Sequence, residues 1–278
     1  MQPATAIKRP DEGDAYVAFD NVSVSFASPR GTVTALEDIT FSIPRSSFVS
    51  VIGPSGCGKS TIFNVLGGLL RQTSGTVRVD GSPVSGASKG AGLVFQEDSA
   101  FPWRTVLDNV AFPLELRGVA KDERHSRARE FIKLVGLTGF EGKYPSELSG
   151  GMRQRVSLAR TLVTEPALLL MDEPFAALDE QTRLLIGDKI SQIHHELKQT
   201  TLLITHNITE AVQLSDKVLV MTYRPGRIKS VIDIDLPWPR SSEVVGSEAF
   251  GAYVGRIWQD LREEASRGLE DASRGAAA

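Results

Sequence analysis

Alternating apolar and polar positions predict β-strands near the start of the chain. Apolar residues recur over 16–26 at nearly every second position, as a half-buried strand requires. A turn signal over 28–31 separates this segment from a second strand over 33–43. A further strand is predicted over 76–79, between Ser74-Gly75 and Asp80-Gly81. We expect an antiparallel β-subdomain here.

Continuous apolar runs mark a different kind of sheet further along. Leu168–Met171 has no polar position, which is typical of a strand buried on both faces of a parallel sheet. Helical and strand-like segments alternate with such runs, which predicts an α/β core with a mostly parallel sheet and helices on both faces. The strands are expected over 49–52, 92–96, 168–171, 201–204 and 217–221, and the helices from 59 to 66, over 182–197 and over 208–214.

Two stretches have helical spacing outside this alternation. Residues 105–137 carry charged faces and one apolar side, and Ser149 is a candidate N-cap for a helix that ends before Glu165-Pro166. After Pro237-Trp238-Pro239, residues 244–265 predict one or two amphipathic helices. This C-terminal segment either packs on the chain's own core or binds a partner. Residues 1–14 are expected to be a flexible tail, and 267–278 to be disordered.

Composition limits the class of protein. The 278 residues are 41% hydrophobic and 23% charged, which is ordinary for a globular protein, and the net charge of −3 argues against a nucleic-acid partner. Cys57 is the single cysteine, so no internal disulfide forms. No apolar run is long enough to cross a bilayer. We expect a cytoplasmic location.

A phosphate-binding loop follows the strand at 49–52. Gly53, Gly58, Lys59 and Ser60 fit G-x-x-x-x-G-K-[ST], with a strand before the motif and a helix after it. In such a loop backbone N–H groups surround the phosphates, the lysine reaches the β- and γ-phosphates, and the serine hydroxyl ligates Mg²⁺. The predicted nucleotide-binding residues of this segment are Gly53, Pro54, Ser55, Gly56, Cys57, Gly58, Lys59, Ser60 and Thr61.

Two further motifs complement the loop. Asp172 and Glu173 close an apolar strand, where Asp172 can reach Mg²⁺ and Glu173 can act as general base on the attacking water. The alternative for this pair is a helix N-cap before Pro174. Ser149, Gly150 and Gly151 begin a helix with free N–H groups, which predicts a second anion site.

Together these motifs resemble the ATP-binding cassette (ABC) ATPases. Leu-Ser-Gly-Gly-Met-Arg-Gln-Arg (148–155) is similar to the family signature, which other P-loop families lack. Gln96 resembles the Q-loop glutamine, Asp179 the D-loop aspartate and His206 the switch histidine, although a lone histidine after a strand is more often structural. Phe26 lies where the family stacks an aromatic ring on adenine. The resemblance implies an ABC ATPase domain over 15–240, with an inserted helical signature subdomain at about 100–165 and a helical extension over 241–278.

The resemblance also implies a mechanism with ATP and Mg²⁺. Two copies would pair head to tail, with Lys59 and Ser60 of one chain and Ser149 and Gly151 of the other on each ATP. Mg²⁺ would be held by Ser60, Gln96 and Asp172. The implied catalytic residues are Glu173, His206 and Gln96, and Asp179 would connect the two sites.

A narrower likeness concerns the transporter branch. Segments 101–106, 108–118, 144–152 and 224–228 resemble importers of nitrate, aliphatic sulfonates, taurine and bicarbonate. This implies a transmembrane permease, a solute-binding protein and a peripheral location on the cytoplasmic face of the membrane. Ser46-Ser47 departs from the family's usual acidic residue and glycine. The alternatives are an ABC ATPase without a transport role, as in DNA repair or translation, and a P-loop kinase or GTPase.

Three smaller hypotheses concern single side chains. Cys57 is either a reactive thiolate, favoured by Lys59 and the helix N-terminus, or a small filler residue. Phe101 and Trp103 either form a patch that contacts the permease or attach the helical subdomain to the core. His125, His194 and His195 match no motif and are expected on solvated helix faces.

Overall fold

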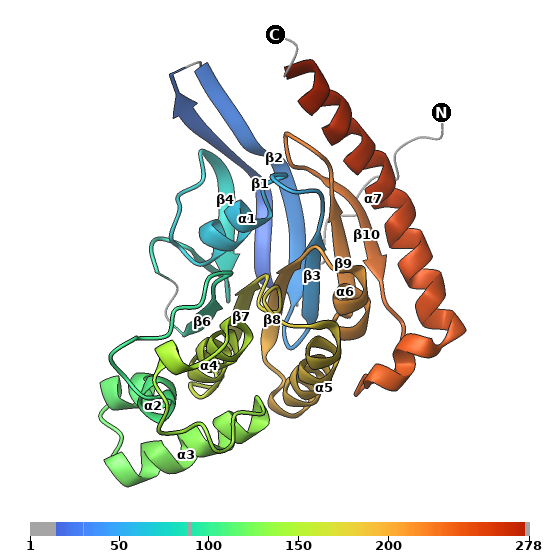
Figure 1. Ribbon diagram of the computed structural model, residues 1–278. Coiled ribbons are helices and arrows are strands. Elements are labelled where there is room, and N and C mark those ends of the chain that lie inside the picture. Colours follow the sequence, from blue (N-terminus) through green and yellow to red (C-terminus); the bar gives the residue numbers. More distant parts are fainter. Residues whose placement is uncertain (1–14, 30, 88–89, 276–278) are drawn as a thin grey trace.

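Two β-sheets form the framework of the structure (Figure 1). It is a computed structural model and describes residues 15–29, 31–87 and 90–275. The smaller sheet is antiparallel, with strand order β2-β1-β4-β5. This confirms the predicted β-subdomain. Its strands are β1 (Ala15–Ser28), β2 (Gly31–Pro44), β4 (Ser74–Val79) and β5 (Ser82–Pro83).

The larger sheet has the strand order β10-β9-β3-β8-β7-β6, and only β10 runs antiparallel to its neighbour. The predicted mostly parallel sheet is therefore confirmed, while β10 was not predicted because Lys229 and Ser230 interrupt its apolar pattern. The strands are β3 (Phe48–Ile52), β6 (Ala91–Val94), β7 (Leu168–Asp172), β8 (Thr200–Thr205), β9 (Lys217–Met221) and β10 (Ile228–Asp233).

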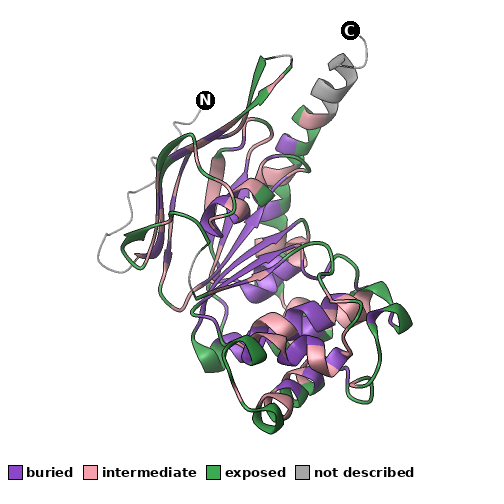
Figure 2. Cartoon of the chain, turned by 90° about the vertical axis from the view of Figure 1, so that its left-hand side faces the viewer, coloured by how far each residue is buried: buried purple, intermediate pink, exposed green. Residues whose placement is uncertain are grey.

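The larger sheet is buried on both faces, as Figure 2 shows. Successive strand residues point to opposite sides, so Leu168 and Leu170 join the cluster beneath the antiparallel sheet, whereas Leu169 and Met171 join the cluster beneath the helices. The chain therefore forms two apolar layers around one sheet. The helices at this sheet are α1 (Lys59–Leu66), α4 (Gly150–Leu162), α5 (Glu180–Leu197) and α6 (Ile208–Leu214).

The helical segment predicted over 105–137 forms two helices, α2 (Val106–Leu116) and α3 (Lys121–Leu134). Gly118 has a φ of 74°, which a right-handed helix cannot contain, and it ends the first helix. Together with α4 these helices form the lobe at the lower left of Figure 1. Short 3₁₀ turns lie over Pro145–Glu147 and Ser242–Gly246.

The C-terminal segment packs on the chain's own sheet. Helix α7 (Glu248–Gly275) lies beside β9 and β10 (Figure 1), and buries Phe250 and Ile257 in a cluster with Val218 and Val220. The hypothesis of docking on the core is thus confirmed. The expected end at residue 265 is wrong, because the helix continues to Gly275 through residues predicted to be disordered. The tail 1–14 lies outside the described residues.

The expectation for His194 is also wrong. This side chain is buried, between the rings of Phe48 (5.2 Å between centroids) and Trp238 (5.1 Å). Burial disfavours the charged imidazolium and lowers the pKa of His194 to about 4. His195, the next residue, is exposed as expected, while His125 is half-buried with Nε2 3.2 Å from Asp108 Oδ1.

Candidate functional site

The phosphate-binding loop connects β3 to α1, as predicted. Gly58 has a φ of 103°, and a Cβ atom there would lie 2.6 Å from Leu36 Cδ2 and 2.9 Å from the Ala35 carbonyl oxygen. Only glycine fits this position, so the turn can bring α1 close under β2. The N-terminus of α1 then faces the loop, where its partial positive charge attracts an anion.

Lys59 is held close to this loop. Its side chain is buried, and Nζ donates hydrogen bonds to the carbonyl oxygens of Gly53 (2.8 Å) and Pro54 (2.9 Å). These bonds fix the ammonium group at the start of the phosphate-binding loop. A phosphate bound by the loop amides would therefore meet a positive charge that is already in position.

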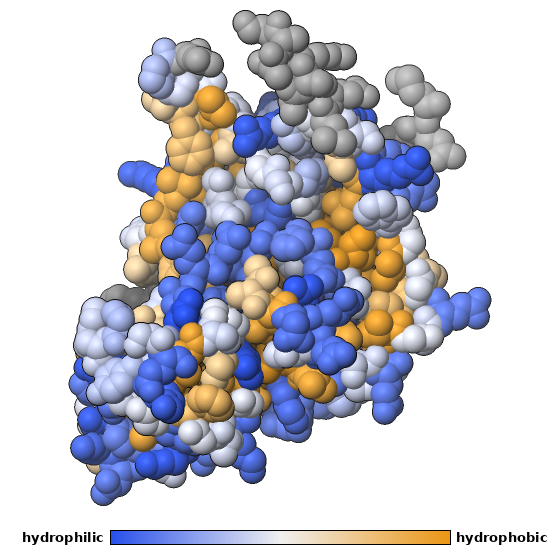
Figure 3. Space-filling view, viewed as in Figure 1, coloured by the Kyte–Doolittle hydropathy of each residue, from blue (hydrophilic) through white to orange (hydrophobic). Residues whose placement is uncertain are grey.

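A cavity of about 650 Å³ opens beside the loop. Its volume lies in the range of pockets that bind small molecules and cofactors. It is lined by the predicted residues Phe26, Ser55, Gly56, Gly58, Lys59, Ser60, Thr61, Gln96, Glu173 and His206, and by Val33, Thr34, Ala35 and Arg224, which were not predicted as site residues. Figure 3 shows hydrophobic surface over the β1–β2 hairpin, where Phe26 is 42% exposed and free to stack on a base.

Gln96, Glu173 and His206 meet at one side of this cavity, although they are far apart in the sequence. Glu173 Oε2 lies 3.4 Å from Gln96 Nε2 and 3.1 Å from His206 Nδ1. Glu173 has a φ of 46°, and its N–H donates to the Ile204 carbonyl (2.8 Å), which fixes this uncommon backbone conformation. A carboxylate so placed is suited to polarise water at the end of a bound phosphate chain.

Asp172 is suited to a hard cation. It is buried at the end of β7, and burial raises the pKa of its carboxyl group, against the opposing effects of the Ser60 hydroxyl and Lys59. Oδ1 has no hydrogen-bond partner among the described residues. The residues present thus fit Mg²⁺, with Ser60 and Asp172 as protein ligands. The described side chains form no cluster of three acidic, histidine or cysteine groups, so phosphate and water would supply the other ligands.

Cys57 lies beneath the loop and is fully buried. Burial raises the pKa of its thiol, and the nearby Lys59 only partly opposes this effect. A thiol with a raised pKa and no exposed surface is a poor nucleophile. The hypothesis of a reactive thiolate is therefore wrong, and Cys57 fills space below the loop. It is close to Gly53, where a Cβ atom would lie 2.8 Å from its Sγ.

The second predicted anion site is separate from the cavity. Ser149 is the N-cap of α4, where its Oγ accepts from the Met152 N–H (3.3 Å), and it leads into Gly150 and Gly151. Asp179 is the N-cap of α5 and accepts from the Thr182 N–H (2.9 Å) and hydroxyl (2.7 Å), which lower the pKa of its carboxyl. The cavity lining includes none of the predicted residues Ser149, Gly150, Gly151 and Asp179.

Comparisons with known proteins identify the family. The ABC transporter family model matches residues 36–176. Over 270 residues, 97% of this chain and 100% of the relative, the chain is 43% identical to an uncharacterised ABC transporter ATP-binding protein of Methanocaldococcus jannaschii. The chain belongs to the ABC transporter family. It is an ATP hydrolase of this family, with the P-loop fold that the resemblance implied.

Other relatives of this ABC ATPase carry more specific names. It is 47% identical to the taurine import ATP-binding protein TauB of Burkholderia thailandensis, over 80% of this chain and 85% of the relative. It is 43% identical to the aliphatic sulfonates import ATP-binding protein SsuB of Bacillus cereus, over 88% and 95%. The solved structures include a dimeric ATP-binding cassette bound to ADP and Pi, which matches with a TM-score of 0.73 and 30% identity over 80% of this chain and all of that chain.

Proposed function

We propose that this chain is the ATP-hydrolysing subunit of an importer and that it acts as a homodimer. The observation that carries the proposal is that the residues predicted to bind one ATP lie in two separate places on the chain. Lys59, Ser60 and Glu173 lie at or beside the cavity, whereas Ser149 and Gly151 begin a helix elsewhere on the surface. A second copy, turned head to tail, would bring its Ser149 and Gly151 to the phosphates.

In the proposed site each side chain has one task. Lys59 and the loop amides bind the phosphates, Ser60, Gln96 and Asp172 would hold Mg²⁺, and Phe26 stacks on adenine. Glu173 takes the proton of the attacking water, and His206 orients Glu173 through its Nδ1. Asp179 would connect the two sites of the dimer. Bound Mg²⁺ supplies charge stabilisation at the transferred phosphate.

The importer assignment rests on the relatives. Proteins named for taurine and aliphatic sulfonate import share 43% to 47% of aligned residues with this chain. None of the helices in the described part of the chain combines the length and apolar character that a membrane span needs. We propose a peripheral location on the cytoplasmic face of the membrane, a separate permease, a solute-binding protein, and a small sulfonate-, taurine- or nitrate-like solute.

The experiment that tests the site is Glu173→Gln. Glutamine has nearly the same shape but cannot take a proton, so ATP binding should persist while turnover falls at least ~100-fold. ATP should then hold the variant as a dimer in gel filtration. Glu165→Gln, at an exposed residue outside the cavity, is the control and should hydrolyse ATP like the unmodified chain. Normal turnover in Glu173→Gln would reject this residue as the base.

The importer assignment has its own test. The chain is purified from its native membrane, and the proteins that accompany it are identified by mass spectrometry. A co-purifying permease supports the proposal, and uptake of labelled taurine, alkanesulfonate and nitrate then identifies the solute. Recovery without any membrane protein would contradict the importer assignment.

A further inference from the structure

The loop over Thr222–Arg227 connects the C-terminal helix to the nucleotide cavity. On one side it joins β2, since the Gly226 N–H donates to the Ala35 carbonyl (3.0 Å) and the Glu37 N–H donates to the Gly226 carbonyl (2.9 Å). On the other side it touches the phosphate-binding loop, because a Cβ atom on Gly226 would lie 2.0 Å from the Cys57 carbonyl oxygen. The loop thus lies between β2 and the phosphate-binding loop, both of which line the cavity.

Arg224 extends from this loop into the cavity lining. Its Nε donates to the Gly56 carbonyl (2.8 Å). Its Nη2 also lies close to the Gly56 backbone, because a Cβ atom added to Gly56 would be only 2.6 Å from it. Among the described residues, the Nη atoms of Arg224 have no hydrogen-bond partner, and no carboxylate forms an ion pair with them. A guanidinium fixed at one N–H, with the others free beside a phosphate-binding loop, is arranged to bind an anion.

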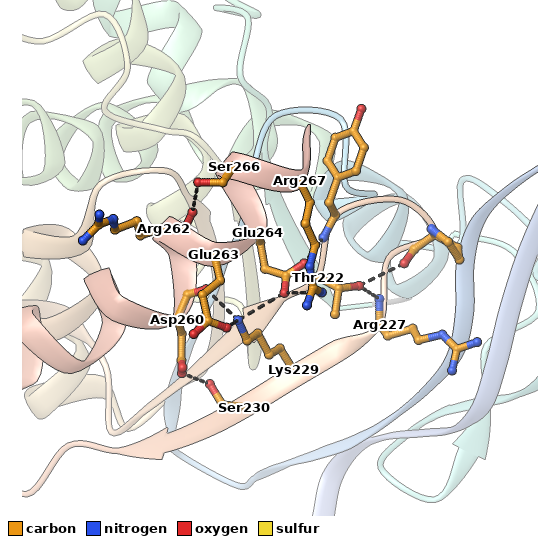
Figure 4. Close-up of polar contacts among 12 residues, drawn as sticks. Thr222, Arg227, Lys229, Ser230, Asp260, Arg262, Glu263, Glu264, Ser266 and Arg267 are labelled. Atoms are coloured by element: carbon orange, nitrogen blue, oxygen red, sulfur yellow. Dashed lines mark hydrogen bonds and ion pairs between the residues drawn. The ribbon is translucent and has the colours of Figure 1, made fainter. Parts of the chain in front are cut away.

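Glu264 of α7 holds the backbone next to Arg224. This carboxylate is 1% exposed, and Oε2 accepts from the Tyr223 N–H (2.9 Å), while Oε1 lies 3.1 Å from Lys229 Nζ and 3.0 Å from Arg267 Nη1. Figure 4 shows Glu264 at the centre of this network, between α7 and the strand that carries Lys229. A buried carboxylate is stable only when it is well paired, and these contacts hold the Glu264 side chain in one position. Its bond to the Tyr223 N–H therefore fixes the backbone of the loop next to Arg224.

We propose that Arg224 binds the phosphate chain of the nucleotide and that Glu264 is its positioning residue. The C-terminal helix then contributes to ATP affinity without touching ATP. Two contacts carry this inference, the bond of Glu264 to Tyr223 and the bond of Arg224 to Gly56, together with the free guanidinium N–H groups at the cavity. The inference rests on the proposed nucleotide site, so ATP binding by the unmodified chain is measured first. If that chain binds no ATP, the site assignment fails rather than this inference.

The first test compares Arg224→Ala with Arg224→Lys in the full chain, by calorimetric titration with ATP. Loss of a charge-assisted hydrogen bond should raise the Kd of Arg224→Ala about tenfold. Arg224→Lys keeps the charge but loses the planar guanidinium group. Its Kd for ATP should therefore lie between that of the unmodified chain and that of Arg224→Ala. An unchanged Kd in Arg224→Ala, with normal binding by the unmodified chain, would overturn the proposal.

The second test addresses Glu264, with Glu263→Ala as the matched control. Glu263 also pairs with Lys229 (2.7 Å) but does not contact Tyr223. Glu264→Ala and Glu264→Asp, which cannot reach the Tyr223 N–H, should raise the KM for ATP about fivefold and change kcat less than about twofold. Glu264→Gln retains an acceptor oxygen and should restore the KM.

Thermal unfolding separates this role from a purely structural one. Kinetics are measured well below the melting temperature of each variant. If Glu264→Ala and Glu264→Asp lower the melting temperature but leave the KM for ATP unchanged, Glu264 stabilises the helix only and the positioning role is rejected. A KM raised equally in Glu263→Ala would also reject it, because Lys229 rather than Tyr223 would then be the relevant contact.

Discussion

His194 shows how burial at one residue changes the response of the protein to pH. Its pKa is lowered from the ordinary value of 6.5 to about 4, because burial outweighs the attraction of Asp216, and Lys198 and Arg240 act in the same direction as burial. Between these values the unfolded chain binds a proton that the folded chain does not. Stability from this group is therefore complete above pH 6.5 and is lost as pH falls towards 4.

We expect the free energy of unfolding in urea to fall by up to about 3 kcal/mol over this range because of His194 alone. His194→Leu removes the titrating group, so its unfolding free energy should depend less on pH between 6.5 and 4. His195→Leu, at the exposed neighbouring position, should keep the slope of the unmodified chain. Equal slopes in all three proteins would show that His194 titrates normally.

The residues predicted from local pattern alone are those whose partners lie nearby in the chain, whereas Gln96 and His206, which meet Glu173 only in the fold, were predicted from the resemblance to the family. The phosphate-binding loop follows its strand and precedes its helix, so its geometry is encoded within one short segment. Arg224 was not identified as a site residue because it meets Gly56 only through folding, across 168 positions. Its basic side chain in a glycine-containing loop was the one available signal. His194 was misplaced because helical spacing alone does not show that Trp238 covers it.

At the scale of elements, the buried face of α7 is expected to contribute to the free energy of unfolding. Ile257 is 0% exposed in the cluster that joins α7 to β9 and β10, whereas its neighbour Trp258 is 59% exposed. Ile257→Ala should lower the free energy of unfolding by about 2–4 kcal/mol, since it removes a buried side chain and leaves a cavity. Trp258→Ala should change it by less than about 0.5 kcal/mol. Chemical denaturation measures both, and a larger loss in Trp258→Ala would place the contact face of α7 elsewhere.

Elements were predictable where their pattern is periodic and uninterrupted. The buried strands β3, β7 and β8 are built around short apolar runs, and the structure contains them within a residue or two of the expected bounds. The edge strand β10 was missed, because Lys229 and Ser230 pair with α7 rather than with solvent. The end of α7 was misjudged for a related reason: the segment around Glu264 is held by polar contacts with Tyr223 and Lys229, which apolar spacing does not reveal.

At the scale of the whole molecule, the segment after Gln96 links the nucleotide site to the helical subdomain. Gln154 Nε2 of α4 donates to the Phe95 carbonyl (2.9 Å), and the Ser99 N–H donates to Ser157 Oγ (3.0 Å). Further on, the Phe101 N–H donates to the buried Asn109 Oδ1 (2.7 Å). A displacement of Gln96 on ATP binding would thus be passed to α2 and α4 through fixed contacts.

Trp103 is the exposed end of this connection. Its ring stacks on Phe101, with 5.4 Å between centroids, and 72% of the residue is exposed, so it does not attach the subdomain to the core. A large aromatic side chain held on the surface in this way is suited to a partner. On the proposed importer function, that partner is the permease. The hypothesis of a coupling patch stays a prediction for Trp103, whose ring packs on the half-buried Phe101.

We predict that Trp103→Ala will leave the melting temperature and the ATP affinity of the isolated chain unchanged, because the residue has little buried surface to lose. Its binding to the permease should weaken by about 2 kcal/mol, the cost of removing an aromatic anchor from an interface. Co-purification and solute uptake would then fall together. Leu116→Ala, at a residue of the same subdomain that is 73% exposed, is the control for nonspecific loss of surface. If Trp103→Ala instead lowers the melting temperature while permease binding stays normal, the side chain stabilises the subdomain and the permease contacts another face.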